Sequence, residues 1–281
     1  MGDTVKPMRL LSAAVLSAVI AGTAATAFAA EPGATPARMS WSFAGPFGTF
    51  DRAQLQRGFQ VYKEVCASCH GLKYVAFRNQ AQPGGPGFTE DQARVIAAEY
   101  QIQDGPDSTG EMFERPGRLS DHFPSPAPND EALRSRFGGA LPPDLSVITK
   151  ARSYESGLVI GLTDFFRQYQ EHGADYVHAI LTGYEDPPAG TTIDPAQAWN
   201  RYFPGHVIAM VKPLSDDQIT YADGSPQTVD QYARDVSAFL HWAAEPHLEQ
   251  RKRIGFQVMI FLIVFAGLMY FTKKKVWSQA H

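Results

Sequence analysis

Apolar residues recur with a helical period in two stretches that lie far apart in the chain. In residues 51–65, one predicted helix face contains Leu55, Phe59, Tyr62 and Cys66. In residues 228–244, a second apolar face contains Val229, Tyr232, Ala233, Val236, Phe239, Leu240 and Ala243. The two patterns predict amphipathic helices that bracket most of the chain.

Polar residues at the start of each stretch support these boundaries. Asp51 and Gln54 hold the positions of a capping box before the first helix, and Thr228 and Gln231 do so before the second. Gly58 lies inside the first helix, where the absence of a side chain would let another helix approach closely. A second helix is therefore expected to cross the first near this glycine.

Between these helices the periodicity is weaker. We expect further helical pieces over residues 89–100, 145–152, 161–169 and 174–182. Residues 104–141 are rich in proline, glycine and charge and are expected to be irregular. The whole pattern predicts a mainly α-helical domain with long loop insertions.

The end of the chain has a different pattern. Residues 255–272 are 18 consecutive positions without a charge, which is roughly 27 Å of helix and close to the thickness of a bilayer core. Basic triplets flank this run at residues 251–253 and 273–275. A buried core helix is the alternative, but such a helix is seldom bracketed by basic triplets. We predict a transmembrane helix over residues 251–275, including its basic flanks, and a short cytoplasmic tail over residues 276–281.

The beginning of the chain is typical of an export signal. Lys6 and Arg9 precede a short apolar run, and Ala27-Phe28-Ala29 matches a cleavage site. We predict that residues 1–29 are a cleaved signal peptide and that residues 30–250 form an exported domain. The expected location is the bacterial inner membrane, crossed once, with the folded domain on the periplasmic side.

Charge is distributed unevenly between the ends and the exported domain. The whole chain has a formal charge of −4. Residues 30–250 contain 17 Lys and Arg against 28 Asp and Glu, a net charge of −11. Such a domain would repel nucleic acid and attract a basic protein partner.

Cys66-Ala67-Ser68-Cys69-His70 is a Cys-x-x-Cys-His run, the pattern of c-type haem attachment. Two thiols can form thioether bonds with the haem vinyl groups, and His70 then lies beside the ring as an iron ligand. A chance match, a zinc site, a thioredoxin-like redox pair and a disulfide are the alternatives. Zinc would need two more ligands, and a redox pair of that kind would follow a strand rather than a helix.

A second iron ligand would come from the opposite side of the ring. Three methionines lie outside the two terminal segments: Met39, Met112 and Met210. Met210 follows an apolar stretch with prolines at both ends, which could hold a thioether against iron. Ordinary core packing of Met210 and ligation by His206 remain open on this pattern alone.

The chain resembles the cytochrome c1 family, the haem subunits of quinol–cytochrome c reductase (cytochrome bc1) complexes. The resemblance covers nearly the whole mature chain. It is carried by Arg57-Gly58-Phe59-Gln60-Val61-Tyr62, Glu111-Met112-Phe113, Arg115-Pro116-Gly117, Gly139-Ala140-Leu141-Pro142-Pro143-Asp144-Leu145-Ser146, Leu181-Thr182-Gly183-Tyr184, Tyr202-Phe203-Pro204-Gly205 and Trp242-Ala243-Ala244-Glu245-Pro246.

The resemblance implies a c-type cytochrome fold and one covalent haem c per chain, held by Cys66 and Cys69. It implies His70 and Met210 as the two iron ligands. By the same resemblance Pro142 and Pro143 line the haem, Arg152 pairs with a propionate and Tyr176 lies near the ring. Two positions depart from the family pattern: Phe137, where Asn is common, and His206, where Gln or a similar residue often stands.

The resemblance also implies the partners. These are cytochrome b, a Rieske iron-sulfur protein and a soluble, usually basic cytochrome c, in a complex expected to be dimeric, with membrane lipid around the anchor. No catalysis is expected from the chain by itself. A free-standing membrane-anchored cytochrome c that feeds an oxidase or reaction centre is the second hypothesis, and a haem enzyme such as a peroxidase is the third.

Overall fold

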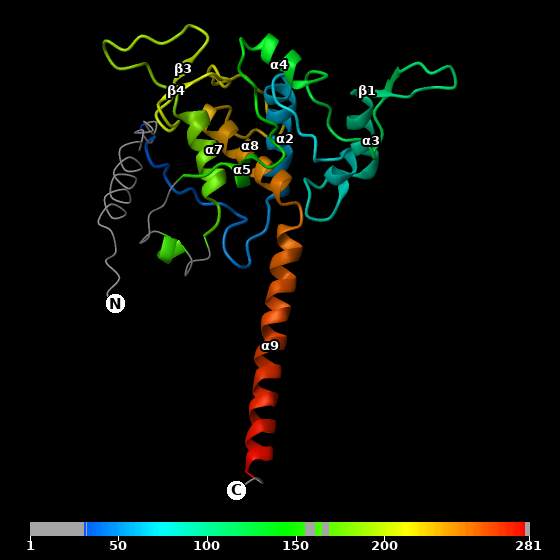
Figure 1. The fold of residues 1–281 in the computed structure, drawn as a ribbon, viewed down its shortest axis with the longest axis vertical. Coiled ribbons are helices and arrows are strands. Elements are labelled where there is room, and N and C mark those ends of the chain that lie inside the picture. Colours follow the sequence, from blue (N-terminus) through cyan, green and yellow to red (C-terminus); the bar gives the residue numbers. More distant parts are fainter. Residues whose placement is uncertain (1–30, 32, 155–160, 165–168, 279–281) are drawn as a thin grey trace, which may run out of the picture.

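The computed structural model describes residues 31, 33–154, 161–164 and 169–278 (Figure 1). A helical domain stands at one end of a single long helix, α9 (Leu248–Trp277), which is the last described element of the chain. The predicted signal peptide lies outside the described residues.

Two helices from opposite ends of the domain form its centre. Helix α2 (Arg52–Glu64) crosses helix α8 (Val229–Ala244) at Gly58. A Cβ at Gly58 would lie 2.1 Å from the backbone oxygen of Asp235, so only glycine allows the helices this close. The predicted close crossing is confirmed, and around it lie the buried aromatic side chains Phe59, Tyr62, Phe123, Tyr232, Phe239 and Trp242.

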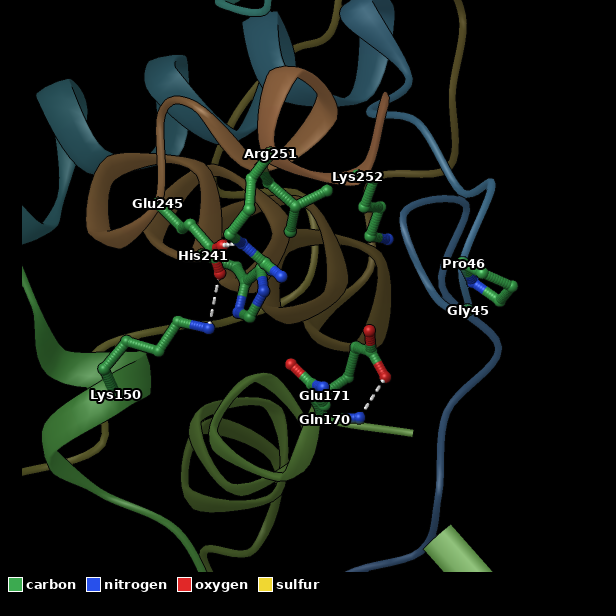
Figure 2. A pocket seen from close by; sticks show the side chains of 10 residues that line it. Gly45, Pro46, Lys150, Gln170, Glu171, His241, Glu245, Arg251 and Lys252 are labelled. Carbon is green, nitrogen blue, oxygen red and sulfur yellow. Dashed lines mark hydrogen bonds and ion pairs between the residues drawn. The ribbon is translucent and has the colours of Figure 1, made fainter. Parts of the chain in front are cut away.

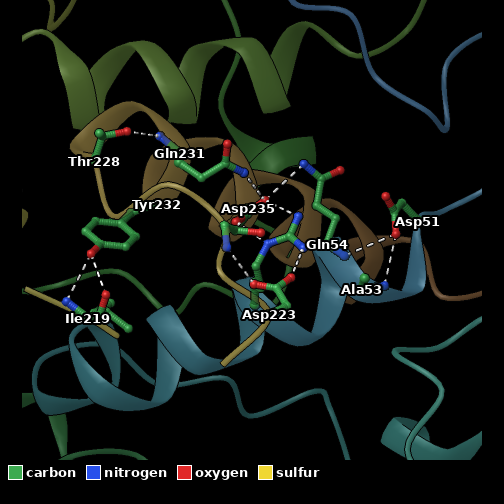
Figure 3. A network of polar contacts seen from close by, with 11 residues as sticks. Asp51, Ala53, Gln54, Ile219, Asp223, Thr228, Gln231, Tyr232 and Asp235 are labelled. Atoms are coloured by element: carbon green, nitrogen blue, oxygen red, sulfur yellow. Dashed lines mark hydrogen bonds and ion pairs between the residues drawn. The ribbon is translucent and has the colours of Figure 1, made fainter. Parts of the chain in front are cut away.

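The predicted helix caps are confirmed only in part. The Asp51 carboxylate accepts from the backbone amides of Ala53 and Gln54, as an N-cap should. The side chain of Gln54, however, donates to the Asp235 carboxylate instead of returning to the cap. Gln231 does the same at the start of α8 (Figure 3). The expected capping boxes are therefore half formed, because both glutamine side chains donate to the buried carboxylate of Asp235 instead.

Asp235 is the centre of a polar network inside the crossing. Its carboxylate is fully buried and accepts from Nε of Arg57 at 2.8 Å (Figure 3). The same guanidinium donates to Asp223 at 2.8 Å. Since a buried charge is costly unless it is paired and hydrogen-bonded, this network ties α2 to α8.

Shorter elements surround this pair. Helix α7 (His172–Thr182) and the short helix α5 (Ile148–Ala151) pack on α8, and helix α3 (Glu90–Ala98) packs on the 3-10 helix η2 (Phe77–Ala81). Asp175 on α7 is fully buried and binds the N-terminal segment through Nε1 of Trp41, at 2.8 Å. Tyr169 donates to the same carboxylate at 2.6 Å.

One expectation about the loops is wrong. The segment expected to be irregular contains helix α4 (Asp130–Arg136) and most of an antiparallel hairpin, β1 (Gln101–Asp104) and β2 (Phe113–Pro116). A second small hairpin pairs β3 (Ala198–Trp199) with β4 (Val207–Ile208). These elements are too short to give a periodic signal, and β1, β2 and α4 are also rich in polar residues.

The helical domain joins α9 (Leu248–Trp277) through a brief break after α8. Glu249 in the first turn of α9 forms an ion pair with Arg52 at 2.9 Å, and Nζ of Lys252 donates to the carbonyl of Phe43. Helix α9 has 30 residues and is apolar enough to cross a membrane, and its span is exposed along its length. The predicted fold class, mainly helical with an apolar C-terminal helix, is confirmed.

Candidate haem-binding site

Helix α2 ends one residue before the Cys-x-x-Cys-His run. A 3-10 turn, η1 (Cys66–Ser68), follows directly. The backbone amides of Cys69 and His70 both donate to the carbonyl of Cys66, at 3.1 and 2.9 Å. This turn holds the two thiols and the imidazole in one compact stretch at the end of a rigid helix.

Both cysteines are free thiols and both are partly buried, so the disulfide alternative is not formed. Burial, together with the neighbouring Cys69, raises the pKa of the Cys66 thiol to about 12. Among the described residues, no group of three or more His, Cys, Asp or Glu side chains converges on a bare metal site. The zinc alternative therefore has no ligand set in this part of the chain.

His70 is oriented by one hydrogen bond. Its Nδ1 lies 2.7 Å from the carbonyl oxygen of Pro143. Because a carbonyl only accepts, Nδ1 must carry the proton, and Nε2 keeps its lone pair. Burial lowers the pKa of His70, and the bond to Pro143 partly opposes that shift. A neutral imidazole with a free Nε2 is the form that binds iron.

Segment 142–146 is fastened to the chain that follows His70. The amide of Leu145 donates to the carbonyl of Gly71 at 2.9 Å, and the amide of Lys73 donates to the Asp144 carboxylate at 3.0 Å. A Cβ at Gly71 would lie 2.8 Å from that carboxylate, so a larger residue would make the Asp144 side chain shift. The role of Asp144 in holding this segment was not predicted from the sequence, although Asp-x-Ser is a recognisable local turn signal.

Met210 follows the second small hairpin. Its backbone oxygen accepts from the hydroxyl of Tyr184 at 3.0 Å, and its side chain packs against the same core cluster as Cys66. His206 lies in the hairpin with a φ of 61° and stacks on Trp199 with ring centroids 4.9 Å apart. Because His206 is engaged within its own hairpin, the arrangement favours Met210 as the second ligand. That assignment stays a prediction.

Arg152 and Tyr176 come together from different elements. Arg152 follows α5 and is exposed, whereas Tyr176 is half-buried on α7. Burial raises the pKa of Tyr176, and the charge of Arg152 opposes the shift. Within the described residues Arg152 has no ion pair, so its guanidinium is available for an anionic group such as a propionate.

The remaining site predictions have simpler surroundings. Pro142 is half-buried and Pro143 is exposed. Phe137 is the C-cap residue of helix α4. The guanidinium carbon of Arg136 lies over the ring of Phe137, 5.5 Å from the ring centroid. No contact of Phe137 with the haem-attachment turn is present among the described residues.

These residues fit a covalently attached haem: two nearby thiols, an imidazole protonated on Nδ1, and a guanidinium that has no ion pair within the described part of the chain. Residues 41–280 match the Cytochrome C1 family. The chain belongs to this family. Cytochrome c1 proteins are haem proteins of electron transport, so membership implies a c-type haem cofactor for this chain.

Individual relatives agree with the family match. The chain is 60% identical over 265 residues to cytochrome b/c1 of Bradyrhizobium diazoefficiens, covering 94% of this chain and 39% of the relative. It is 48% identical over 264 residues to cytochrome c1 of Blastochloris viridis, covering 92% and 93%. It is 44% identical over 257 residues to the mitochondrial heme protein cytochrome c1 of Saccharomyces cerevisiae, covering 91% and 76%. This chain thus spans about two fifths of the fused b/c1 relative and most of the other two.

Proposed function

We propose that the chain is the electron-transfer subunit of a quinol–cytochrome c reductase complex. It takes one electron at a time from a Rieske iron-sulfur protein and passes it to a soluble cytochrome c. Cytochrome b completes the set of redox partners, and the complex is expected to be dimeric. The observation that carries the proposal is the bond between His70 and Pro143, which fixes the imidazole in its ligand form at the end of a Cys-x-x-Cys-His turn.

The proposed roles of the residues follow from their chemistry. Cys66 and Cys69 attach one haem c, His70 and Met210 bind its iron, and Arg152 neutralises a propionate. Pro142, Pro143 and Tyr176 line the ring. When bound, haem supplies a one-electron iron couple. With both axial positions filled, this chain would not bind a substrate at the iron, and no catalysis of its own is proposed.

The acidic domain supports a basic electron acceptor. With a net charge of −11 over residues 30–250, the domain would raise the encounter rate with a positively charged cytochrome c in a salt-dependent way. Helix α9 supports single-pass anchoring in the bacterial inner membrane. We place the helical domain on the periplasmic side after removal of residues 1–29. N-terminal sequencing of the mature chain tests the cleavage site.

Purification in mild detergent tests the assembly. We expect cytochrome b and an iron-sulfur subunit to co-purify with the full chain, together with quinol-dependent reduction of cytochrome c. Recovery of the chain alone, with its haem intact, would favour the second hypothesis, a free-standing anchored cytochrome c that feeds an oxidase or reaction centre.

Replacement of Met210 tests the iron ligand. Met210→Leu should lower the reduction potential by on the order of 100 mV, since axial ligands tune haem potentials over about 0.8 V, and the ferrous protein should then bind CO. Met112→Leu is the matched control, because Met112 is 54% exposed on the hairpin of β1 and β2 and should change neither property. Rapid CO binding by the unaltered protein would instead support a haem enzyme.

A further inference from the structure

A loop near the N-terminal end of the domain presents one large apolar side chain to the outside. Phe43 and Phe50 at the base of this loop are buried in the core, whereas Phe47 at its tip is 71% exposed. Figure 1 shows the loop, in blue, reaching down beside the first turns of α9. An exposed aromatic ring in this position needs an explanation that the haem site does not give.

The loop is built to hold Phe47 outward. The amide of Thr49 donates to the carbonyl of Ser42 at 3.1 Å and closes the base of the loop. Gly45 has a φ of 71°, and a Cβ at Gly48 would lie 2.1 Å from the carbonyl oxygen of Ala44. Both glycines are therefore required by the turn, and the outward direction of Phe47 follows from a constrained backbone.

The loop is also fastened to α9. Nζ of Lys252 donates to the carbonyl of Phe43 at 2.5 Å, and Figure 2 shows Lys252 extending toward the loop that carries Gly45 and Pro46. The ring of Phe47 meets the ring of Phe256 edge-on, with centroids 5.4 Å apart. The loop and the first turns of the helix thus form one surface.

The position of the Phe47–Phe256 contact along α9 indicates which part of a membrane would surround it. Phe256 comes three residues after Arg253, the last charged residue before the apolar span, which is about 4.5 Å along a helix. The contact therefore lies where charged side chains end and apolar ones begin. In a membrane-spanning helix this is the boundary between headgroups and acyl chains, where aromatic side chains gather.

We propose that the loop over residues 45–48 is a second membrane contact, with Phe47 inserted into the lipid interface beside α9. The occupant is lipid, because the surface is continuous with the apolar face of the span. This inference rests on the proposed anchoring of the chain by α9. The loop and the helix together would fix the height of the domain above the membrane.

Photocrosslinking in native membranes tests the contact. Phe47 is replaced by p-benzoylphenylalanine in the full chain, and covalent haem content verifies folding. We expect crosslinked peptides carrying the mass of a phospholipid. Tyr74, which is 63% exposed on the helical domain, is the matched control position and should give at least tenfold less lipid adduct.

Two outcomes would overturn the proposal. Crosslinks from position 47 to a polypeptide would show that a protein covers the loop, and a yield equal to that of position 74 would show that the loop lies in water. Resistance of the same samples to alkaline carbonate extraction reports separately on α9. A chain that stays in the membrane without lipid adducts at position 47 would refute this inference alone.

Discussion

The crossing of α2 and α8 and the candidate haem-binding site at the end of α2 are stabilised in different ways. At the crossing, side chains decide the structure: Gly58 admits the second helix and the buried Asp235 is paired with Arg57. Around the Cys-x-x-Cys-His turn, hydrogen bonds to loop backbone join separate segments, since the carbonyls of Gly71, Pro143 and Met210 all accept hydrogen bonds. The Asp144 carboxylate adds bonds to the amides of Lys73 and Ser146. The crossing is the support, and the partly exposed loops attached to it carry the candidate haem-binding residues.

Two histidines illustrate the same difference. Burial lowers the pKa of both His70 and His241. His241 is enclosed in the core, stacks on Phe43 and has no partner for its Nδ1 in the described part of the chain. Nδ1 of His70 is bonded to the carbonyl of Pro143, which leaves the lone pair on Nε2. Burial favours the neutral form of both rings, but only His70 has the hydrogen bond to a loop carbonyl that suits the proposed ligand role.

The largest effect on stability is expected from removing the partner of Asp235. Arg57→Ala should lower the free energy of unfolding by about 3–5 kcal/mol, because it leaves a buried carboxylate without its cation. Denaturant titration of the detergent-solubilised holoprotein measures the change. Arg94→Ala is the control: Arg94 pairs with Glu90 and Asp91 at an exposed site, where about 0.5 kcal/mol is expected. Equal losses in the two variants would contradict the role of the network.

A methyl group at the crossing should cost somewhat less. Gly58→Ala would force its Cβ against the backbone of Asp235 and should lower stability by about 3 kcal/mol. The thermal midpoint of the holoprotein is a suitable measure. Gly161→Ala serves for comparison, because a Cβ at Gly161 would meet no atom within 4 Å. If the Gly58→Ala protein had the same thermal midpoint as the unaltered chain, the helices could move apart without a loss of stability.

The pH dependence of stability should identify the core histidine. Burial, with added repulsion from Lys150, lowers the pKa of His241 to about 3. The unfolded chain therefore binds the extra proton first as pH falls below about 6.5, and stability decreases. Between pH 6.5 and pH 5 this should remove about 1.6 kcal/mol, because the slope rises from half of about 1.36 kcal/mol per pH unit at pH 6.5 toward its full value at pH 5.

His241→Phe should flatten this decline while keeping a ring against Phe43. The charged groups that line the adjoining cavity, and that remain in the variant, are Lys150, Glu171, Glu245, Arg251 and Lys252 (Figure 2). His122→Phe at an exposed position should leave the slope unchanged. If both variants retain the slope of the unaltered chain, another group is responsible for it.

The smallest effect on global stability is expected at segment 142–146. Asp144→Asn weakens the bonds to the amides of Lys73 and Ser146 and should cost about 1 kcal/mol. Amide hydrogen exchange at residues 73 and 146 should nevertheless become clearly faster. Asp107→Asn is the control, because Asp107 accepts from amides only within the distant hairpin of β1 and β2. Unchanged exchange at both amides would mean that Asp144 does not hold the segment.

The parts of the molecule that the sequence predicted are those with a local signal. The apolar periods marked α2 and α8, Gly58 marked their crossing, and an uncharged run marked α9. Cys66, Cys69 and His70 were identified because their spacing within one turn is itself the requirement of the chemistry. The residues expected to line the haem came from the family resemblance and stay predictions.

The rest depended on contacts between distant segments. No pattern near His70 indicates that the carbonyl of Pro143, 73 residues later, accepts its proton. The glutamines at positions 54 and 231 were assigned to capping boxes, but both donate to a carboxylate that only the folded core brings near. The strands β1 to β4 have two to four residues each and form through pairing rather than through periodicity.

The joint at the beginning of α9 has a consequence for motion. Leu248 is buried, and Glu249 accepts both from the guanidinium of Arg52 and from the amide of Phe50. These contacts restrain the domain from rotating relative to α9. Under the proposed function, the distances over which electrons enter and leave the domain would then change through movement of the partner proteins rather than of this subunit.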